Sequence, residues 1–116
     1  MQKTFWMSYK IKTIEIFEKQ AKRLIKKYPS LKNELLLLVK ELKENPQQGT
    51  GIGKCCYKIR IAIASRQSGK SVGGRVITNI VISENTVYML SIYDKAEKEN
   101  LTEKELTQLL KDIPGQ

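Results

Sequence analysis

The spacing of apolar residues changes several times along the chain, and each change predicts a new element. Alternation from Tyr9 to Ile16 predicts a strand, and its phase breaks at Thr13 and Ile14, which we interpret as a bulge. From Phe17 to Tyr28 the apolar residues recur at helical spacing: Phe17, Ala21, Leu24, Ile25 and Tyr28. This segment is therefore expected to be a helix with one apolar face.

A second helix with the same pattern is predicted directly afterwards. Pro29 ends the first helix, and Ser30 is expected to cap the second. The apolar positions of this helix are Leu31, Leu35, Leu38, Val39 and Leu42, and Asn45-Pro46 ends it. Two helices with matching stripes and a short break predict a helical hairpin that covers one face of a sheet.

The second half of the chain has the pattern of β-strands. Gln47 to Gly53 is rich in glycine and predicts a loop. Alternation from Tyr57 to Ile63 predicts a half-buried strand. Two more strands are expected over Arg75–Ile82 and Val87–Tyr93, with a tight turn over Ser83–Asn85 between them.

A last helix completes the order of elements. Thr102 and Glu105 have the spacing of a capping box, and Pro114-Gly115 ends the apolar pattern that follows. The order strand, helix, helix, three antiparallel strands, helix predicts an α+β fold with an antiparallel sheet. Its 116 residues suffice for one domain, so we expect residues 1–116 to form a single domain with residues 1–7 as a ragged start.

Charge is distributed unevenly along this pattern. The formal net charge is +9, which implies acidic partners such as nucleic acid. Every charge between Glu44 and Glu84 is basic: Lys54, Lys58, Arg60, Arg66, Lys70 and Arg75. Lys58 and Arg60 are two residues apart on a predicted strand and share its polar face, which is expected to point away from the core. We interpret this segment, from Asn45 to Ser83, as the contact with an RNA phosphate backbone. The alternative is an ordinary solvated face that lacks acids.

Several kinds of chemistry are excluded by composition. The chain has no histidine, and the adjacent Cys55 and Cys56 make a poor disulfide and a poor metal site, so they are expected to be reduced packing residues. The run from Ala64 to Ser71 fits a relaxed phosphate-loop pattern, but a strand rather than a helix follows it. We therefore expect no metal, no cofactor and no bound nucleotide.

The expected location is the cytoplasm. The longest strongly apolar run, Leu35–Val39, is far shorter than the roughly 20 residues that a membrane helix needs. The first ten residues also lack the apolar stretch of a secretory signal. No membrane partner is expected.

Without histidine or a metal site, lysine and arginine provide the one remaining route for cleavage of a phosphodiester. RNA supplies its own nucleophile, the 2′-hydroxyl, while arginines neutralise the phosphate as charge builds and a lysine moves a proton. The glycine-rich segment from Ser65 to Gly74 is expected to carry Arg66 and Lys70 toward a polyanion. Tyr93, followed by Lys95, lies at the exit of the last strand and suits stacking on an unpaired base, although a tyrosine packed at the sheet edge is an equal alternative.

Three segments resemble the RelE/ParE toxin superfamily, and within it the HigB-like toxins of type II toxin–antitoxin modules. They are Tyr57–Ala62, Gly69–Ile77 and Leu90–Lys95, and the resemblance extends over the chain from about Tyr9 onward. It implies the small RelE-like fold and a toxin that cuts mRNA on the ribosome without a metal. It also implies a cognate antitoxin of the helix-turn-helix type, encoded by a neighbouring gene. We expect this antitoxin to have an acidic, partly disordered segment that wraps the basic domain.

The same resemblance assigns roles to individual positions. It implies that Arg60 and Arg75 hold the scissile phosphate. Tyr93 would stack on a base, and Lys95 is a candidate for proton transfer. The remaining expected RNA contacts are Lys54, Lys58, Arg66 and Lys70. Two other functions stay open from the sequence: a ParE-like toxin that poisons gyrase without cutting RNA, and a non-catalytic RNA-binding module.

Overall fold

A computed structural model describes residues 8–63 and 73–115 of this protein. Its helices and strands follow one another in the order that the sequence predicts, with one additional strand, β2 (Thr50–Gly53). They are β1 (Lys10–Thr13), α1 (Glu15–Lys27), α2 (Leu31–Glu44), β2 (Thr50–Gly53), β3 (Cys56–Ile61), β4 (Gly74–Val81), the 3-10 turn η3 (Ile82–Glu84), β5 (Thr86–Asp94) and α3 (Glu103–Leu110).

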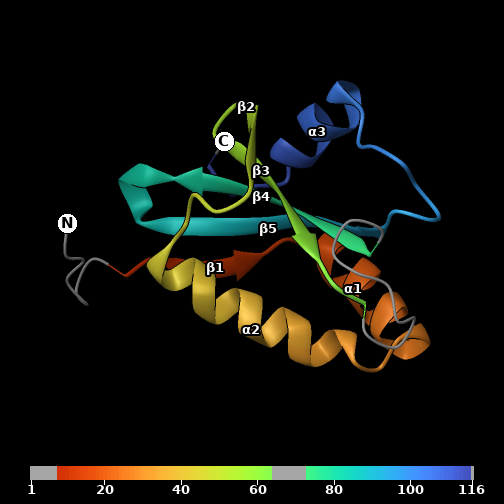
Figure 1. The fold of residues 1–116 in the computed structure, drawn as a ribbon. Coiled ribbons are helices and arrows are strands. Elements are labelled where there is room, and N and C mark those ends of the chain that lie inside the picture. The colour runs from red at the N-terminus through yellow and green to blue at the C-terminus, as the bar shows by residue number, and fades with distance from the viewer. Residues whose placement is uncertain (1–7, 64–72, 116) are drawn as a thin grey trace.

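The strands form one five-stranded sheet in the order β1-β5-β4-β3-β2. The pairs β3–β4 and β4–β5 are antiparallel, as expected for the three strands that the sequence predicts in the second half of the chain. The pair β2–β3 is antiparallel as well. The first strand, β1, instead lies parallel to β5 at the opposite edge, with Lys10 beside Thr86. The sheet is therefore mixed, because the helical hairpin carries the chain across one face before it returns to the sheet (Figure 1).

Three local predictions are wrong. Ser30 precedes α2, but its side chain makes no capping hydrogen bond because the residue already has helical backbone angles. The glycine-rich segment expected to be a loop contains the edge strand β2, whose Gly51 pairs with Tyr57. The break in alternation at Thr13 and Ile14 is not a bulge, because β1 ends at Thr13 and α1 begins at Glu15. In these last two places the period-two signal is too short to define a strand and its ends.

The two faces of the sheet are covered differently. Helices α1 and α2 lie together on one side, and their apolar stripes are buried as predicted, with Leu24 and Leu42 nearly inaccessible. Helix α3 lies on the other side (Figure 1). Its capping box is confirmed: the amide of Glu105 donates to the Thr102 hydroxyl, and the Glu105 carboxylate accepts from the Thr102 amide. Because α3 is short, it covers only part of this second face of the sheet.

None of the described helices has the length and the apolar character that crossing a bilayer requires.

Candidate nucleic-acid interface

Three of the predicted site residues form one row across the three central strands, near one end of the sheet. Arg60 on β3 is paired with Arg75 on β4, and Arg75 is paired in turn with Tyr93 on β5. Cross-strand partners project to the same face of a sheet, so the three side chains share a face although they are far apart in sequence. The next pair on that face is Lys58 and Ile77, which places the row on the side that α3 covers.

The members of this row differ sharply in exposure. Arg60 is exposed, whereas Arg75 has 4% and Tyr93 has 5% of its surface accessible. The Arg75 guanidinium donates to the carbonyl oxygen of Gly74 at 3.0 Å. The expectation that the face shared by Lys58 and Arg60 points away from the core holds for Arg60. Arg75 and Tyr93 are covered in this conformation, and for Tyr93 this burial agrees with the alternative of a packed tyrosine.

The hydroxyl of Tyr93 is buried, and no described group meets it with good hydrogen-bond geometry, although the backbone of Leu101 lies beside it. Burial raises the pKa of Tyr93, while the positive charge of Arg75 acts in the opposite direction. A tyrosine with a raised pKa keeps its proton at neutral pH, so this hydroxyl is a donor and not a base. A buried donor without a well-placed partner is uncommon, and it is directed at the same face as Arg60.

Lys95 continues the ladder by one more position. Its amide donates to the carbonyl of Gly73 at 3.0 Å, so it follows Tyr93 at the end of the β4–β5 pair, and its side chain is half-buried. The residue between them, Asp94, is buried, and its carboxylate accepts from the Ala96 amide at 3.0 Å and from the Tyr28 hydroxyl at 3.3 Å. The predicted proton-transfer candidate thus lies at the same end of the sheet as the row.

Lys54 lies at the other end of this face, in the tight turn between β2 and β3. Lys54 and Cys55 both have positive φ, 56° and 60°, a conformation that non-glycine residues seldom adopt. The Asn79 side-chain amide stabilises the turn by donating to the Lys54 carbonyl at 2.9 Å and the Cys55 carbonyl at 3.3 Å. The Lys54 ammonium then reaches across to the Thr107 hydroxyl of α3 at 2.9 Å.

The two cysteines are not equivalent, which corrects the expectation that both are packing residues. Cys56 begins β3 and is buried, and burial raises the pKa of its thiol. Cys55 is exposed in the turn, and both cysteines are free thiols.

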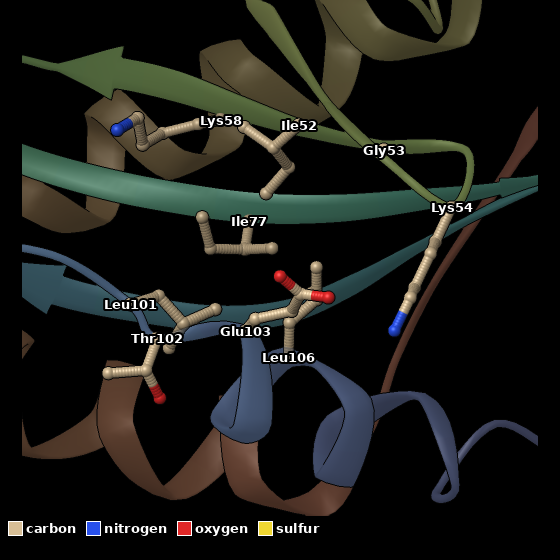
Figure 2. A pocket seen from close by; sticks show the side chains of 9 residues that line it. All are labelled: Ile52, Gly53, Lys54, Lys58, Ile77, Leu101, Thr102, Glu103 and Leu106. Carbon is tan, nitrogen blue, oxygen red and sulfur yellow. The ribbon is translucent and has the colours of Figure 1, made fainter.

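A cavity of about 280 Å³ lies between this hairpin and α3. Figure 2 shows the apolar side chains of Ile52, Ile77 and Leu106 around it, with Glu103 between α3 and the sheet. Lys58 lines the same cavity from β3, two residues from Arg60. The cavity therefore adjoins the exposed end of the row.

Sequence reasoning brings together some of this site and misses the rest. Arg66 and Lys70 lie outside the described residues. The sequence predicts a loop at Ile52, and Glu103 lies outside the acid-free segment, so the sequence points to neither residue. The one signal for Glu103 in the sequence is its place beside Thr102 at the predicted start of the last helix.

A scan against protein-family models gives no match for this chain, and neither does a search of the curated proteins. Two solved structures of the E. coli toxin RelE are similar to it. One is an arginine-to-alanine double mutant in the free state, with a TM-score of 0.62 at 19% sequence identity over 91% of this chain and 98% of that chain. The other is the isolated toxin, with a TM-score of 0.59 at 17% identity over 90% and 98%.

This chain has a RelE-like fold. The likeness extends over nearly the whole of RelE, so the strands, the helical hairpin and the C-terminal helix correspond as one arrangement. The fold that the three sequence segments implied is thereby confirmed.

Proposed function

We propose that this protein is the toxin of a type II toxin–antitoxin module, of the HigB-like branch, and that it cuts mRNA on the ribosome. The observation that carries the proposal is the row of Arg60, Arg75 and Tyr93 across a RelE-like sheet. The likeness to a protein described as a toxin supports the class, and the row supports the chemistry. A fold alone would not distinguish an RNase from other toxins.

The proposed reaction is a transfer within the RNA strand. The 2′-oxygen attacks the adjacent phosphorus, the bond from phosphorus to the 5′-oxygen breaks, and a 2′,3′-cyclic phosphate forms. The 2′-hydroxyl loses a proton to a base, and the leaving 5′-oxygen gains one. In this scheme Arg60 holds the scissile phosphate, since a guanidinium offers two parallel donors to phosphate oxygens.

The remaining roles follow from burial. Tyr93 keeps its proton and is suited to donate toward the phosphate or the leaving oxygen, with Arg75 beside it. Lys95 is the candidate for the second proton transfer. Arg75 and Tyr93 are buried, so they can reach RNA only after the residues that cover them move. The reactive conformation therefore differs from the conformation of the free protein. Dependence on the ribosome is consistent with such a change.

The proposed partners are mRNA, the ribosome and an acidic antitoxin that covers the basic face. The net positive charge supports the acidic antitoxin, because an acidic segment would neutralise the basic side chains that bind RNA. The proposed location is the cytoplasm.

The test is induced expression followed by primer extension on translated mRNA. The wild type should produce new 5′ ends within coding regions and arrest growth. Arg60→Ala should reduce cleavage by about 10²–10³-fold, the usual effect of removing one group that stabilises developing charge. Lys40→Ala, which removes an exposed charge on α2, is the control and should cleave normally. Equal cleavage by Arg60→Ala and the wild type would contradict the assignment.

The burial of Arg75 and Tyr93 favours a second candidate, a module that binds RNA without cutting it. Such a module would bind RNA with a steep dependence on salt and produce no new 5′ ends. Replication arrest with DNA damage and intact mRNA would instead indicate a gyrase poison.

A further inference from the structure

We infer that the cavity between the β2–β3 hairpin and α3 receives one unpaired nucleobase that carries an exocyclic amino group. The inference rests on the proposed RNA ligand and adds a base-reading site to it. It concerns a surface that neither the row nor the predicted contacts include, apart from the two lysines at its edge.

The cavity has the size and the gradient of exposure that a single base requires. Its volume of about 280 Å³ is below the roughly 300–1,000 Å³ typical of drug-sized ligand sites. The buried side chains of Ile77 and Leu106 form its floor, and the half-buried Ile52 and Leu101 form its walls. Apolar walls suit the faces of a planar base, which loses water when it enters.

Glu103 supplies the polar group that would read the base. Its side chain is exposed, lies over this apolar cavity and makes no ion pair with any described residue. Figure 2 shows its carboxylate between α3 and the sheet, on the side of Ile77. A carboxylate only accepts hydrogen bonds, so it pairs well with an exocyclic amino group such as that of cytosine. The single N3–H donor of uracil lies between two carbonyl oxygens, which would repel the carboxylate.

The charges at the edge indicate where the backbone of the RNA would run. Lys54 and Lys58 line the cavity from the hairpin, and Figure 2 shows their ammonium groups on opposite sides of it. A phosphate inside the cavity would meet the carboxylate of Glu103, whereas a phosphate at its edge would meet lysine. This arrangement places the base inside and the phosphates outside, in line with Arg60 two residues along β3.

An apolar side chain of a protein partner is the competing occupant. It would use the walls equally well but would have no use for a lone carboxylate at the mouth of the cavity. Glu103 therefore favours the base.

The test uses the full-length protein and short 2′-O-methyl RNAs, which cannot be cleaved because the nucleophile is blocked. Fluorescence anisotropy would compare oligocytidine with oligouridine. The wild type should prefer oligocytidine, and Glu103→Gln should reduce that preference by about tenfold, because the amide also donates. Glu99→Gln removes the same charge at an exposed position outside the cavity and should keep the preference.

A second pair of variants tests the walls. Ile52→Trp should fill the cavity and reduce the affinity for oligocytidine, whereas Ile82→Trp, at an exposed position outside the cavity, should not. Equal binding of the two RNAs by the wild type, or equal effects of Glu103→Gln and Glu99→Gln, would overturn the inference. So would Ile52→Trp binding RNA normally while it loses a protein partner.

The two proposals can fail separately. Base preference without cleavage of translated mRNA would keep the pocket and refute the nuclease. Cleavage at unchanged sites by Glu103→Gln would keep the nuclease and refute the pocket.

Discussion

The two faces of this sheet are built on different principles. The face under α1 and α2 is covered by two helices of 13 and 14 residues whose apolar stripes match. The face under α3 is covered by a helix of 8 residues, and it holds Arg60, Arg75, Tyr93 and Lys58 as well as apolar residues. The first face stabilises the fold, and the second face combines a smaller apolar contact with the groups that we propose to act on RNA.

The difference teaches where chemistry can be accommodated in a small domain. Polar groups under a continuous helical cover would have to be satisfied within the core, at a cost of about 1–3 kcal/mol for each that is not. On the α3 face, Arg60 is exposed and the cavity is open beside it, so this charge keeps access to water. Arg75 is buried on the same face, where its guanidinium donates to the Gly74 carbonyl. The buried Tyr93 hydroxyl is the exception, and it lies within the proposed site.

The largest expected effect is on the sheet face that α1 and α2 cover. Leu42 on α2 is fully buried, so Leu42→Ala removes apolar contacts and leaves a cavity. We expect a loss of about 2–5 kcal/mol in the free energy of unfolding, measured by chemical denaturation. Leu36→Ala is the matched control on the same helix, since that side chain is 59% exposed, and it should change the free energy by less than about 0.5 kcal/mol. Similar losses in both variants would mean that α2 is covered on its outer side as well.

The two faces also differ in how far the sequence predicts them. The burial of the face under α1 and α2 can be predicted from helical spacing alone, since Phe17, Ala21 and Leu24 are buried where the pattern places them. The alternation of Ile59 and Ile61 likewise predicts their burial under these two helices. Periodicity is a local property, and it suffices where an element buries one continuous stripe.

The α3 face depends on contacts that no local pattern contains. Strand alternation predicts that Lys58 and Arg60 share a face, but the cover on Arg75 and Tyr93 depends on how distant segments pack. The edge strand β2 is missed because Thr50–Gly53 is short and half glycine, which favours a loop on propensity. Its strand conformation comes from pairing with β3, a tertiary effect.

A smaller effect, of opposite sign, sharpens the contrast. Tyr93→Phe removes a buried hydroxyl that no described group meets with good hydrogen-bond geometry, so the free energy of unfolding should stay the same or rise by up to about 1 kcal/mol. If that hydroxyl donates a hydrogen bond in the proposed reaction, cleavage should nevertheless fall. Denaturation and primer extension on the same variant separate the two effects. A variant that is both less stable and normally active would show that the hydroxyl has a structural role instead.

The smallest expected effect concerns the ion pairs that connect the two sides of the sheet. Glu97, in the link between β5 and α3, pairs with Arg23 at 2.7 Å and Lys27 at 3.1 Å, both on α1. The hydrogen bond from Arg23, followed by that from Lys27, lowers the pKa of Glu97 from 4.5 to about 2. A carboxylate with a lowered pKa stabilises the folded state above its unfolded pKa, and the contribution is lost as the pH falls from 4.5 through about 2.

Glu97→Gln should therefore be less stable than the wild type near neutral pH, and the difference should shrink on acidification. Because the Glu97 side chain is 35% exposed and its partners are more so, solvent and salt screen the pairs, and we expect less than about 1 kcal/mol. Denaturation at about pH 6 and about pH 3, with and without added salt, measures this difference. Glu99→Gln, at an exposed position in the same link, is the control. A difference independent of pH would show that Glu97 joins the two sides through packing and not through its charge.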